Sequence, residues 1–362
     1  MTGKERAAIR RLRAGIVPSW ALERLSVSYD AVKRSIDTSL EHVLAQNQVP
    51  PLFVQGEWGV GKTHLLSYVQ ASARSLGVPC AFVSLDAHSY ALNYPQRFYA
   101  AIAERITVER TVGLQAVLTH LLFEDRTRTA LLEFANSLEA GDLYWPIVTL
   151  CEQSKHGEIA LNEQEYAWNI LLGLDVSWST YPYKRRAALA RLTALSKMFG
   201  AVGLGGLVLL FDEAETIDQL WNIRSRFTAY TTIGSLCQSP GLWCLFGITD
   251  RFNRTLDLDL ERIEWTTYDL DGDAQWFLNH WKKRSFTLLQ PPSVGRGFAP
   301  EVVQRVAALY KDAHSCELDP ALLQQAIHDW SKNPIRNPRR LIRGVIERLD
   351  QSRALSASAP QS

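Results

Sequence analysis

The feature that most limits the possible folds of this chain is a glycine-rich segment. It follows the apolar run Leu52–Val54 and precedes a stretch whose apolar residues have the spacing of a helix. Its residues are Gly56, Glu57, Trp58, Gly59, Val60, Gly61, Lys62 and Thr63. The spacing G-x-x-x-x-G-K-[ST] suits a nucleoside triphosphate because glycines let successive backbone N–H groups turn toward phosphates. We expect Lys62 to reach the β- and γ-phosphates, the Thr63 hydroxyl to reach Mg²⁺, and the positive end of the following helix to lie beneath them. The alternative is a tight strand-to-helix turn with an incidental lysine.

Length, net charge and apolar runs limit the classes of protein to which this chain can belong. A chain of 362 residues allows about two or three domains. Its net charge of +1 shows no overall basic excess of the kind that marks nucleic-acid or membrane binding. The charged N-terminus leads into no apolar segment, and the longest nearly apolar run, residues 201–211, is well short of the ~20 residues of a membrane span. We expect a cytoplasmic protein without a membrane segment.

The apolar runs predict an α/β fold. Residues 81–85 complete a strand–helix–strand unit with the loop, which implies a parallel sheet with a right-handed crossover. Further strands are predicted at Leu207–Phe211, which reads as buried on both faces, at residues 242–248, and by alternation at Ile263–Leu270. The result is a five-stranded parallel sheet.

The domain organisation follows from where the strands stop. Residues 1–270 are predicted to form the sheet domain, interrupted by a purely helical insertion at about 107–200. Residues 271–352 contain only helical patterns and are predicted to form a helical lid. Residues 353–362 are predicted to be a disordered tail.

Polar residues follow two of the predicted strands, at the edge where ligands of open α/β sheets bind. Asp212 is expected to hold Mg²⁺ and Glu213 to polarise the attacking water, with Glu215 ranked third. Thr249 ends a strand expected between the loop strand and the Asp-Glu strand, where it would face the γ-phosphate or the water. An N-cap role for Thr249 or Asp250 is the alternative.

An apolar turn near the N-terminus leaves two interpretations open. Ile16 and Val17 stand between Gly15 and Pro18, ahead of the predicted sheet. They either belong to a packing arm or form an adenine pocket, because the loop holds only phosphates and the base needs separate apolar walls.

The ordered set of loop, Asp-Glu strand, polar-tipped strand and helical lid resembles an AAA+-type ATPase of the origin-recognition-like branch. In that branch a G-N-P-R motif opens the last lid helix, and here Asn337-Pro338-Arg339-Arg340-Leu341 matches it, with Arg336 in place of the glycine. The resemblance implies that Arg339 contacts the γ-phosphate. It also implies an arginine just before the fifth strand that reaches into a neighbour's site. Arg262 occupies that place, and Arg251 and Arg254 are competitors.

A closer resemblance covers most of the chain. The segment Arg13–Pro18, the loop, Asp86 and the segment Gly206–Glu215 are similar to the ATP-binding proteins of BREX-type bacteriophage-exclusion systems. This resemblance implies an ATP-hydrolysing, Mg²⁺-dependent switch or motor that works with other defence-system proteins.

Several alternatives stay open. One is an origin-recognition-like loader that binds DNA, another is a nucleotide-bound scaffold with slow hydrolysis, and a small-molecule kinase is the least favoured. DNA and a second copy of the chain are both candidate partners.

Overall fold

The computed structural model describes residues 2–27, 29–137, 139–156, 161–174, 181–265, 268–291, 297–332 and 337–358. It is a mixed α/β structure with one seven-stranded sheet and mostly helical content. The chain divides into two compact units. We call residues 1–34, 56–68 and 290–362 the loop unit, and residues 35–55 and 69–289 the sheet unit. The domain boundaries predicted at 270 and 352 remain predictions.

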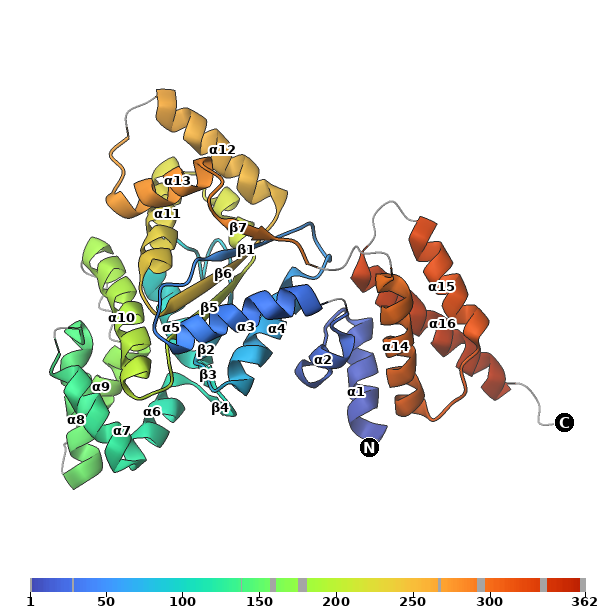
Figure 1. Cartoon of the computed structure of the whole chain (residues 1–362), viewed down its shortest axis with the longest axis horizontal. Coiled ribbons are helices and arrows are strands. Elements are labelled where there is room, and N and C mark those ends of the chain that lie inside the picture. The colour runs from blue at the N-terminus through green and yellow to red at the C-terminus, as the bar shows by residue number, and fades with distance from the viewer. Residues whose placement is uncertain are drawn as a thin grey trace. The chain divides into compact units, whose positions relative to one another are not determined.

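The sheet has the strand order β4-β3-β2-β5-β6-β1-β7 (Figure 1). The five strands from β2 to β7 in this order are parallel, whereas β3 and β4 form an antiparallel hairpin at one edge. Their bounds are β1 Leu52–Gln55, β2 Cys80–Ser84, β3 Thr107–Val108, β4 Thr111–Val112, β5 Leu207–Asp212, β6 Leu242–Ile248 and β7 Thr287–Leu289. The sheet is therefore mixed and larger than the five parallel strands that the sequence predicts.

The last parallel strand is not where the sequence places it. Residues 250–265 form helix α12 (Asp250–Trp265), residues 268–270 have no regular structure, and β7 takes the place beside β1. The predicted strand at 263–270 is therefore wrong, and its residues 266 and 267 lie outside the described part. Ile263, the first residue of that predicted strand, belongs to a helical stripe of buried or half-buried positions that are spaced by four, four and three residues. These are Phe252, Leu256, Leu260 and Ile263.

The insertion is helical, as predicted, but it is not free of strands. Two short pairs of β-branched residues, Thr107-Val108 and Thr111-Val112, flank a tight turn. Glu109 in this turn has a positive φ of 50°. Strands of two residues carry no readable alternation, so the sequence gives no sign of them.

The helices of the sheet unit pack on the sheet and on one another. Helices α3 and α4 begin in the loop unit and end in the sheet unit. The bounds are α3 Asp30–Leu44, α4 Lys62–Ser75, α5 Pro95–Arg105, α6 Leu114–Phe123, α7 Asp125–Ala135, α8 Tyr144–His156, α9 Leu161–Leu172, α10 Tyr181–Ala201, α11 Ile223–Gln238 and α13 Gly272–Lys282, with 3-10 helices η2 Gly141–Leu143 and η3 Ala214–Gln219. None of the described helices of the chain combines the length and apolar character needed to cross a membrane.

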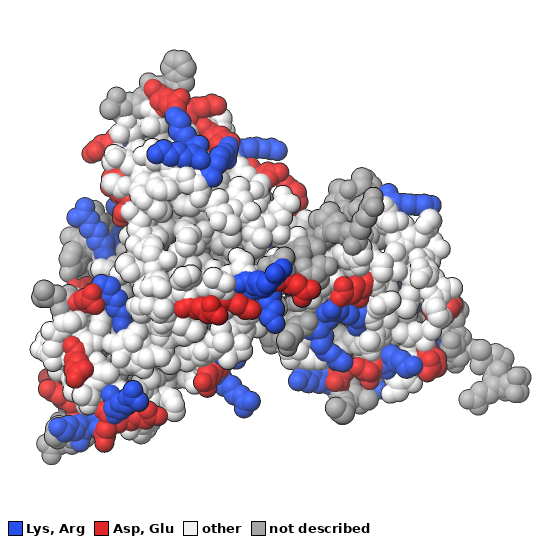
Figure 2. Space-filling model, in the orientation of Figure 1, with Lys and Arg blue, Asp and Glu red and all other residues white. Residues whose placement is uncertain are grey.

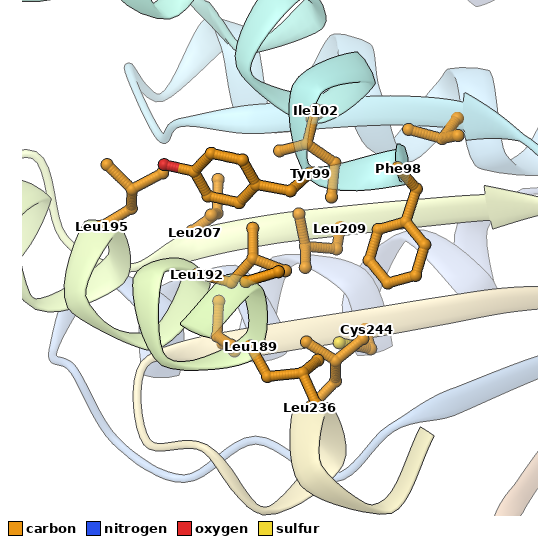
Figure 3. Close-up of a cluster of buried hydrophobic side chains, with 14 of the residues drawn as sticks. Phe98, Tyr99, Ile102, Leu189, Leu192, Leu195, Leu207, Leu209, Leu236 and Cys244 are labelled. Atoms are coloured by element: carbon orange, nitrogen blue, oxygen red, sulfur yellow. The ribbon is translucent and has the colours of Figure 1, made fainter. Parts of the chain in front are cut away.

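A large apolar core fixes the sheet. Figure 3 shows side chains from α5, α10 and α11 meeting residues of β5 and β6, with Tyr99, Leu192 and Leu209 near the centre. Each such fully buried side chain stabilises the fold by about 1.5–3 kcal/mol relative to exposure. The Tyr99 hydroxyl donates to the carbonyl of Leu171 at 2.9 Å, which ties α9 to this core.

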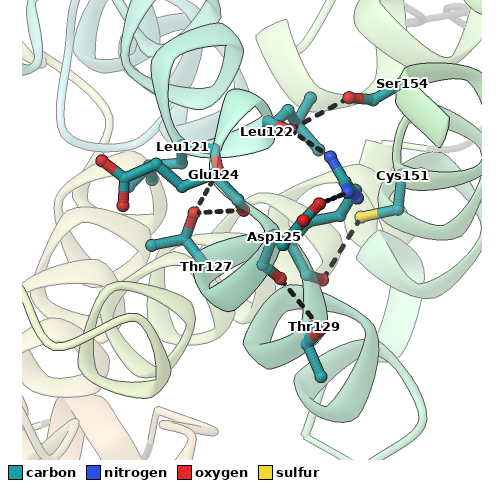
Figure 4. A network of polar contacts seen from close by, with 9 residues as sticks. Leu121, Leu122, Glu124, Asp125, Thr127, Thr129, Cys151 and Ser154 are labelled. Atoms are coloured by element: carbon teal, nitrogen blue, oxygen red, sulfur yellow. Dashed lines mark hydrogen bonds and ion pairs between the residues drawn. The ribbon is translucent and has the colours of Figure 1, made fainter.

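The corner between α6 and α7 is closed by side-chain hydrogen bonds (Figure 4). The Leu122 carbonyl, left over at the end of α6, accepts from Arg128 Nη1 and from Ser154 Oγ, both at 2.9 Å. The Thr127 hydroxyl donates to the Leu121 carbonyl in the same corner. Helix ends need such partners because their last carbonyls have none within the helix.

The loop unit has its own core, made by the first and last helices of the chain. Ile9 and Leu12 of α1 (Thr2–Arg13) are buried with Val306 of α14 and Ile346 of α16. The remaining bounds are η1 Ser19–Ala21, α2 Leu22–Leu25, α14 Phe298–His314, α15 Pro320–Lys332 and α16 Pro338–Ser358.

The predicted tail is wrong in its first half, because α16 continues through residues 353–358. This stretch contains Ala354 and Leu355, which favour helix, and Arg353 contacts the imidazole of His314. Residues 359–362 lie outside the described part.

A buried ion pair holds α12 against α11. Asp259 is 1% exposed and accepts from Arg226 Nε at 2.6 Å, from Arg226 Nη2 at 2.7 Å and from the Tyr230 hydroxyl at 2.9 Å. The remaining Arg226 Nη1 donates to the Leu220 carbonyl at 2.6 Å. Every charged atom of the pair is therefore partnered, and this is the condition under which a buried pair is tolerated.

Removing one partner of the Arg226–Asp259 pair should destabilise the fold. We expect Asp259→Ala to lower the free energy of unfolding by about 3–5 kcal/mol, because it leaves the Arg226 charge buried and unpaired. The matched control is Glu264→Ala, which removes the exposed pair with Lys282 and should cost about 0–1 kcal/mol. Urea unfolding of both variants measures this, and equal losses would contradict the role given to Asp259.

Candidate nucleotide-binding site

The glycine loop takes the conformation that its spacing predicts. It leaves β1 after Gln55, and helix α4 begins at Lys62. Gly59 and Gly61 have φ values of +82° and +112°, which side chains with a Cβ adopt only with strain. A Cβ at Gly56 would lie 2.5 Å from Cγ2 of Val60. Each of these glycines is therefore required by the local geometry.

Lys62 lies folded over the loop. It is only 7% exposed, and its Nζ donates to the Gly56 carbonyl at 2.7 Å and to the Glu57 carbonyl at 3.4 Å. The ammonium also lies 5.6 Å from the centre of the Trp58 ring. The N-terminus of α4 adds the positive end of its dipole beside this cation, so the loop is suited to an anion. The Thr63 side chain is exposed in the first turn of α4.

Sequence reasoning missed the residues that pack beside the loop. Ser26 donates to the Leu22 carbonyl at 2.7 Å, so the 2.9 Å contact with His64 requires the imidazole Nε2–H to donate to Ser26 Oγ. Desolvation lowers the pKa of His64 to about 4, which keeps the ring neutral. The ring of Tyr29 lies edge-on to His64, with centroids 5.6 Å apart. Only the position of His64, directly after Thr63, could have signalled this cluster.

Ile16 and Val17 lie in the same compact unit as the loop. Ile16 is 50% exposed, whereas Val17 is half-buried against the core of the loop unit. The preceding Gly15 has φ of +77°, and a Cβ there would lie 2.8 Å from Cδ of Arg339. The structure therefore brings the apolar turn next to Arg339, and the adenine pocket stays a prediction.

Arg339 is exposed in the first turn of α16, and Asn337 precedes that helix. The Asn337 Oδ1 accepts from the backbone N–H of Arg339 at 2.9 Å and of Arg340 at 3.4 Å, while its Nδ2 donates to the Trp58 carbonyl at 3.1 Å. Asn337 belongs to the sequence motif Asn337–Leu341 but is not among the predicted site residues. Its partner Trp58 lies 279 residues away, so no local pattern could reveal the contact.

The two carboxylates stand at the end of β5 in the sheet unit. Asp212 is 4% exposed, and its Oδ1 accepts from the Glu213 N–H at 3.0 Å. Glu213 is half-buried and has a left-handed backbone with φ of 60°, a conformation that is unusual for a residue with a side chain. Such strain costs about 1–3 kcal/mol and gathers at functional sites. Glu215 is buried in η3.

Thr249 directly follows β6, which lies between β1 and β5 as predicted. Its side chain is 1% exposed, and its hydroxyl has no hydrogen-bond partner among the described residues. A buried hydroxyl without a partner costs about 1–3 kcal/mol, so the position calls for a water or ligand oxygen. Asp250 accepts from Gln55 Nε2 at 2.9 Å and so connects the ends of β6 and β1.

Arg262 does not precede a strand. It lies in the last turn of α12, is largely exposed, and has Nη1 3.7 Å from Asp259 Oδ1. Of its competitors, Arg251 lies 3.7 Å from Asp218, and Arg254 is exposed in α12. The arginine nearest ahead of β7 is instead Arg284, three residues before the strand, with Nη2 3.7 Å from Asp257 Oδ1. The misplaced fifth strand hid this arginine.

One family comparison bears on the site. The model of the family described as BREX system ATP-binding protein BrxC/D matches residues 2–133. That stretch contains α1, Ile16 and Val17, the whole glycine loop, β2 and most of α7, while Asp212, Thr249 and Arg339 lie beyond it. No curated protein matches the chain. The resemblance predicted from the sequence is confirmed over residues 2–133, where the chain matches the family of BREX system ATP-binding proteins BrxC/D.

Proposed function

We propose that this protein binds ATP with Mg²⁺ at the glycine loop, hydrolyses it, and acts as a switch or motor in a prokaryotic anti-phage defence system. The observation that carries the proposal is the loop itself. Gly59 and Gly61 hold positive φ, and Lys62 is buried at the start of α4 with its ammonium on the Gly56 carbonyl. The loop also lies within the stretch that matches a family of ATP-binding proteins of the BREX system.

Magnesium fits the oxygen groups available. The described residues contain no group of three or more His, Cys, Asp or Glu side chains that could hold a metal alone. Mg²⁺ is usually held by one or two protein oxygens together with substrate phosphates. Thr63 and Asp212 would supply those protein oxygens, and the ion would neutralise charge on the transferred phosphate.

The remaining roles follow from position at the sheet edge. Glu213 directly follows the metal-binding Asp212 and would orient the attacking water. Thr249 ends the neighbouring strand with an unsatisfied hydroxyl, which suits a contact with the γ-phosphate or that water. Arg339 would reach the γ-phosphate from the first turn of α16. An arginine just ahead of the last strand would act on a neighbouring copy, and Arg284 takes this place before β7, whereas Arg262 lies within α12.

The loop lysine provides the first test. We expect Lys62→Ala to abolish ATP binding without unfolding the protein, because the ammonium donates here to two neutral carbonyls and would meet its opposite charge in the phosphates. At a hundredfold excess over Kd, ATP–Mg²⁺ should stabilise the wild type by about 2.7 kcal/mol in thermal unfolding and the variant hardly at all. Lys332→Ala, an exposed lysine in the same unit, is the control and should behave as wild type. An unchanged shift in Lys62→Ala would refute the site.

Substitutions of the two carboxylates should separate the effect on ATP binding from the effect on ATP hydrolysis. Glu213→Gln keeps shape and hydrogen bonding but loses charge, so we expect near-normal ATP binding and hydrolysis slower by roughly 10²–10⁴-fold. Asp212→Asn should instead weaken the binding of Mg²⁺–ATP. Phosphate release and nucleotide titration measure the two effects, with exposed Glu261→Gln as control. Wild-type turnover in Glu213→Gln would move the catalytic role to Glu215 or to a partner.

A second candidate function, binding of duplex DNA, is favoured by how charge divides between the units. The loop unit contains 19 Lys and Arg against 11 Asp and Glu, net +8, and the sheet unit 20 against 27, net −7. On the face seen in Figure 2, blue and red side chains alternate, so the excess is not gathered there. The side chains of three exposed arginines of α1 and α16 have no ion-pair or hydrogen-bond partner among the described residues. They are Arg10, Arg11 and Arg340.

Salt dependence tests this candidate. If the three arginines contact phosphates, replacing all of them with Gln should weaken duplex binding and reduce the slope of log affinity against log salt by about 2.7. ATP binding should persist. The control replaces exposed Arg110, Arg126 and Lys155 of the sheet unit with Gln. Fluorescence anisotropy with a labelled duplex measures the slopes, and equal slopes in all three proteins would reject DNA contact by these arginines.

A further inference from the structure

The side chain of Asn337 makes two kinds of contact. Its Oδ1 accepts from the N–H groups of Arg339 and Arg340 at 2.9 and 3.4 Å, which caps the first turn of α16. Its Nδ2 donates to the Trp58 carbonyl at 3.1 Å. All these residues belong to the loop unit. The cap needs only the oxygen, so the bond from the nitrogen calls for a separate reason.

Gly59 leaves the room that this second contact needs. A Cβ at Gly59 would lie 2.2 Å from Nδ2 of Asn337 and 2.8 Å from its Oδ1. Asn337 therefore occupies the space where any other residue at position 59 would place its side chain. The positive φ of Gly59 is a second, independent reason for glycine at this position. The loop and the Asn337 side chain are fitted to each other.

The contact determines where the Gly59 N–H points. The Trp58 carbonyl and the Gly59 N–H belong to one planar trans peptide, so they point in opposite directions. Because the carbonyl is held toward Asn337, the N–H is turned away from it. Backbone N–H groups of a loop with this spacing are its phosphate ligands. Asn337 thus controls the direction of one expected ligand without touching the nucleotide.

The same side chain places the start of α16. The Arg339 N–H is bonded to the Asn337 Oδ1, and the Arg339 side chain packs against the backbone of Gly15. The position of Arg339 relative to the loop is therefore set through Asn337 on one side and through Gly15 on the other.

We propose that Asn337 is a positioning residue that orients the Trp58–Gly59 peptide for a triphosphate and couples occupancy of the loop to the first turn of α16. The inference rests on the proposed nucleotide binding. Coupling of this kind is reciprocal, so a nucleotide that favours the bonded form of the loop stabilises the α16 cap by the same free energy. ATP should then protect the start of α16 as well as the loop.

The decisive variant is Asn337→Ser, which keeps a neutral capping oxygen but is too short to hold the Trp58 carbonyl. We expect its melting temperature without nucleotide to match the wild type and its Kd for Mg²⁺–ATP to rise about three- to tenfold, the range of one lost hydrogen bond. Asn337→Ala loses the cap as well and should show the same loss of affinity with a lower melting temperature. Asn337→Asp is unsuitable because its charge would repel phosphates.

Hydrogen exchange supplies a readout that a cap alone would not change. In Asn337→Ser without nucleotide, amides of residues 56–61 should exchange faster while those of residues 339–343 do not. In the wild type, ATP should slow exchange at 339–343, and in Asn337→Ser that protection should be lost. A Kd equal to the wild type, or retained ATP protection of α16, would overturn the inference. Absence of ATP binding by the wild type itself would instead overturn the proposed function.

Discussion

The candidate site depends on an aromatic ladder that fixes the register of three parallel strands. Phe53 of β1, Phe246 of β6 and Phe211 of β5 are paired across the sheet, and their rings stack with centroids 5.2 and 5.3 Å apart. Such pairs stabilise a sheet by about 0.2–1 kcal/mol each. A slip of one residue would send every side chain to the other face. The ladder therefore determines which residues end the strands at this edge of the sheet.

The consequence of this register is a group of polar residues at successive positions near one edge of the sheet. Gln55 pairs with Ile248, and Asp212 comes one residue after the Phe211–Phe246 pair, level with Gly247. Thr249 then follows directly after the partner of Gln55. The loop leaves β1 at the same edge because Gly56 follows Gln55 in the chain. Parallel pairing alone thus brings the end of β1, the Asp212 carboxylate and the Thr249 hydroxyl to the same edge of the sheet.

Sequence patterns recovered the strands that are buried on both faces and failed where a strand is short or exposed. Every residue of β5 and β6 is buried, and both were predicted from their unbroken apolar runs. The three residues of β7 are mostly exposed, so they leave no such run. The end of α12 was misread as a strand because Ile263, Trp265 and Thr267 alternate in the sequence, whereas Ile263 belongs to a helical stripe with Leu256 and Leu260. For the candidate site, the roles of the loop and of the Asp-Glu residues stay predictions from sequence spacing, whereas the Asn337–Trp58 contact depends on tertiary packing and has no sequence signal.

The loop also shows how a lysine that is already buried in the protein can bind an anion. Lys62 is almost fully buried, so most of the cost of removing its ammonium from water is met when the protein folds. Its present acceptors are two neutral carbonyls and the face of Trp58. Phosphate oxygens would replace them with charge-assisted bonds, which are roughly twice as strong as neutral ones. The free energy gained on binding would then come from exchanging the hydrogen-bond acceptors of Lys62, with little further desolvation of its ammonium. This exchange would favour a triphosphate over an uncharged ligand.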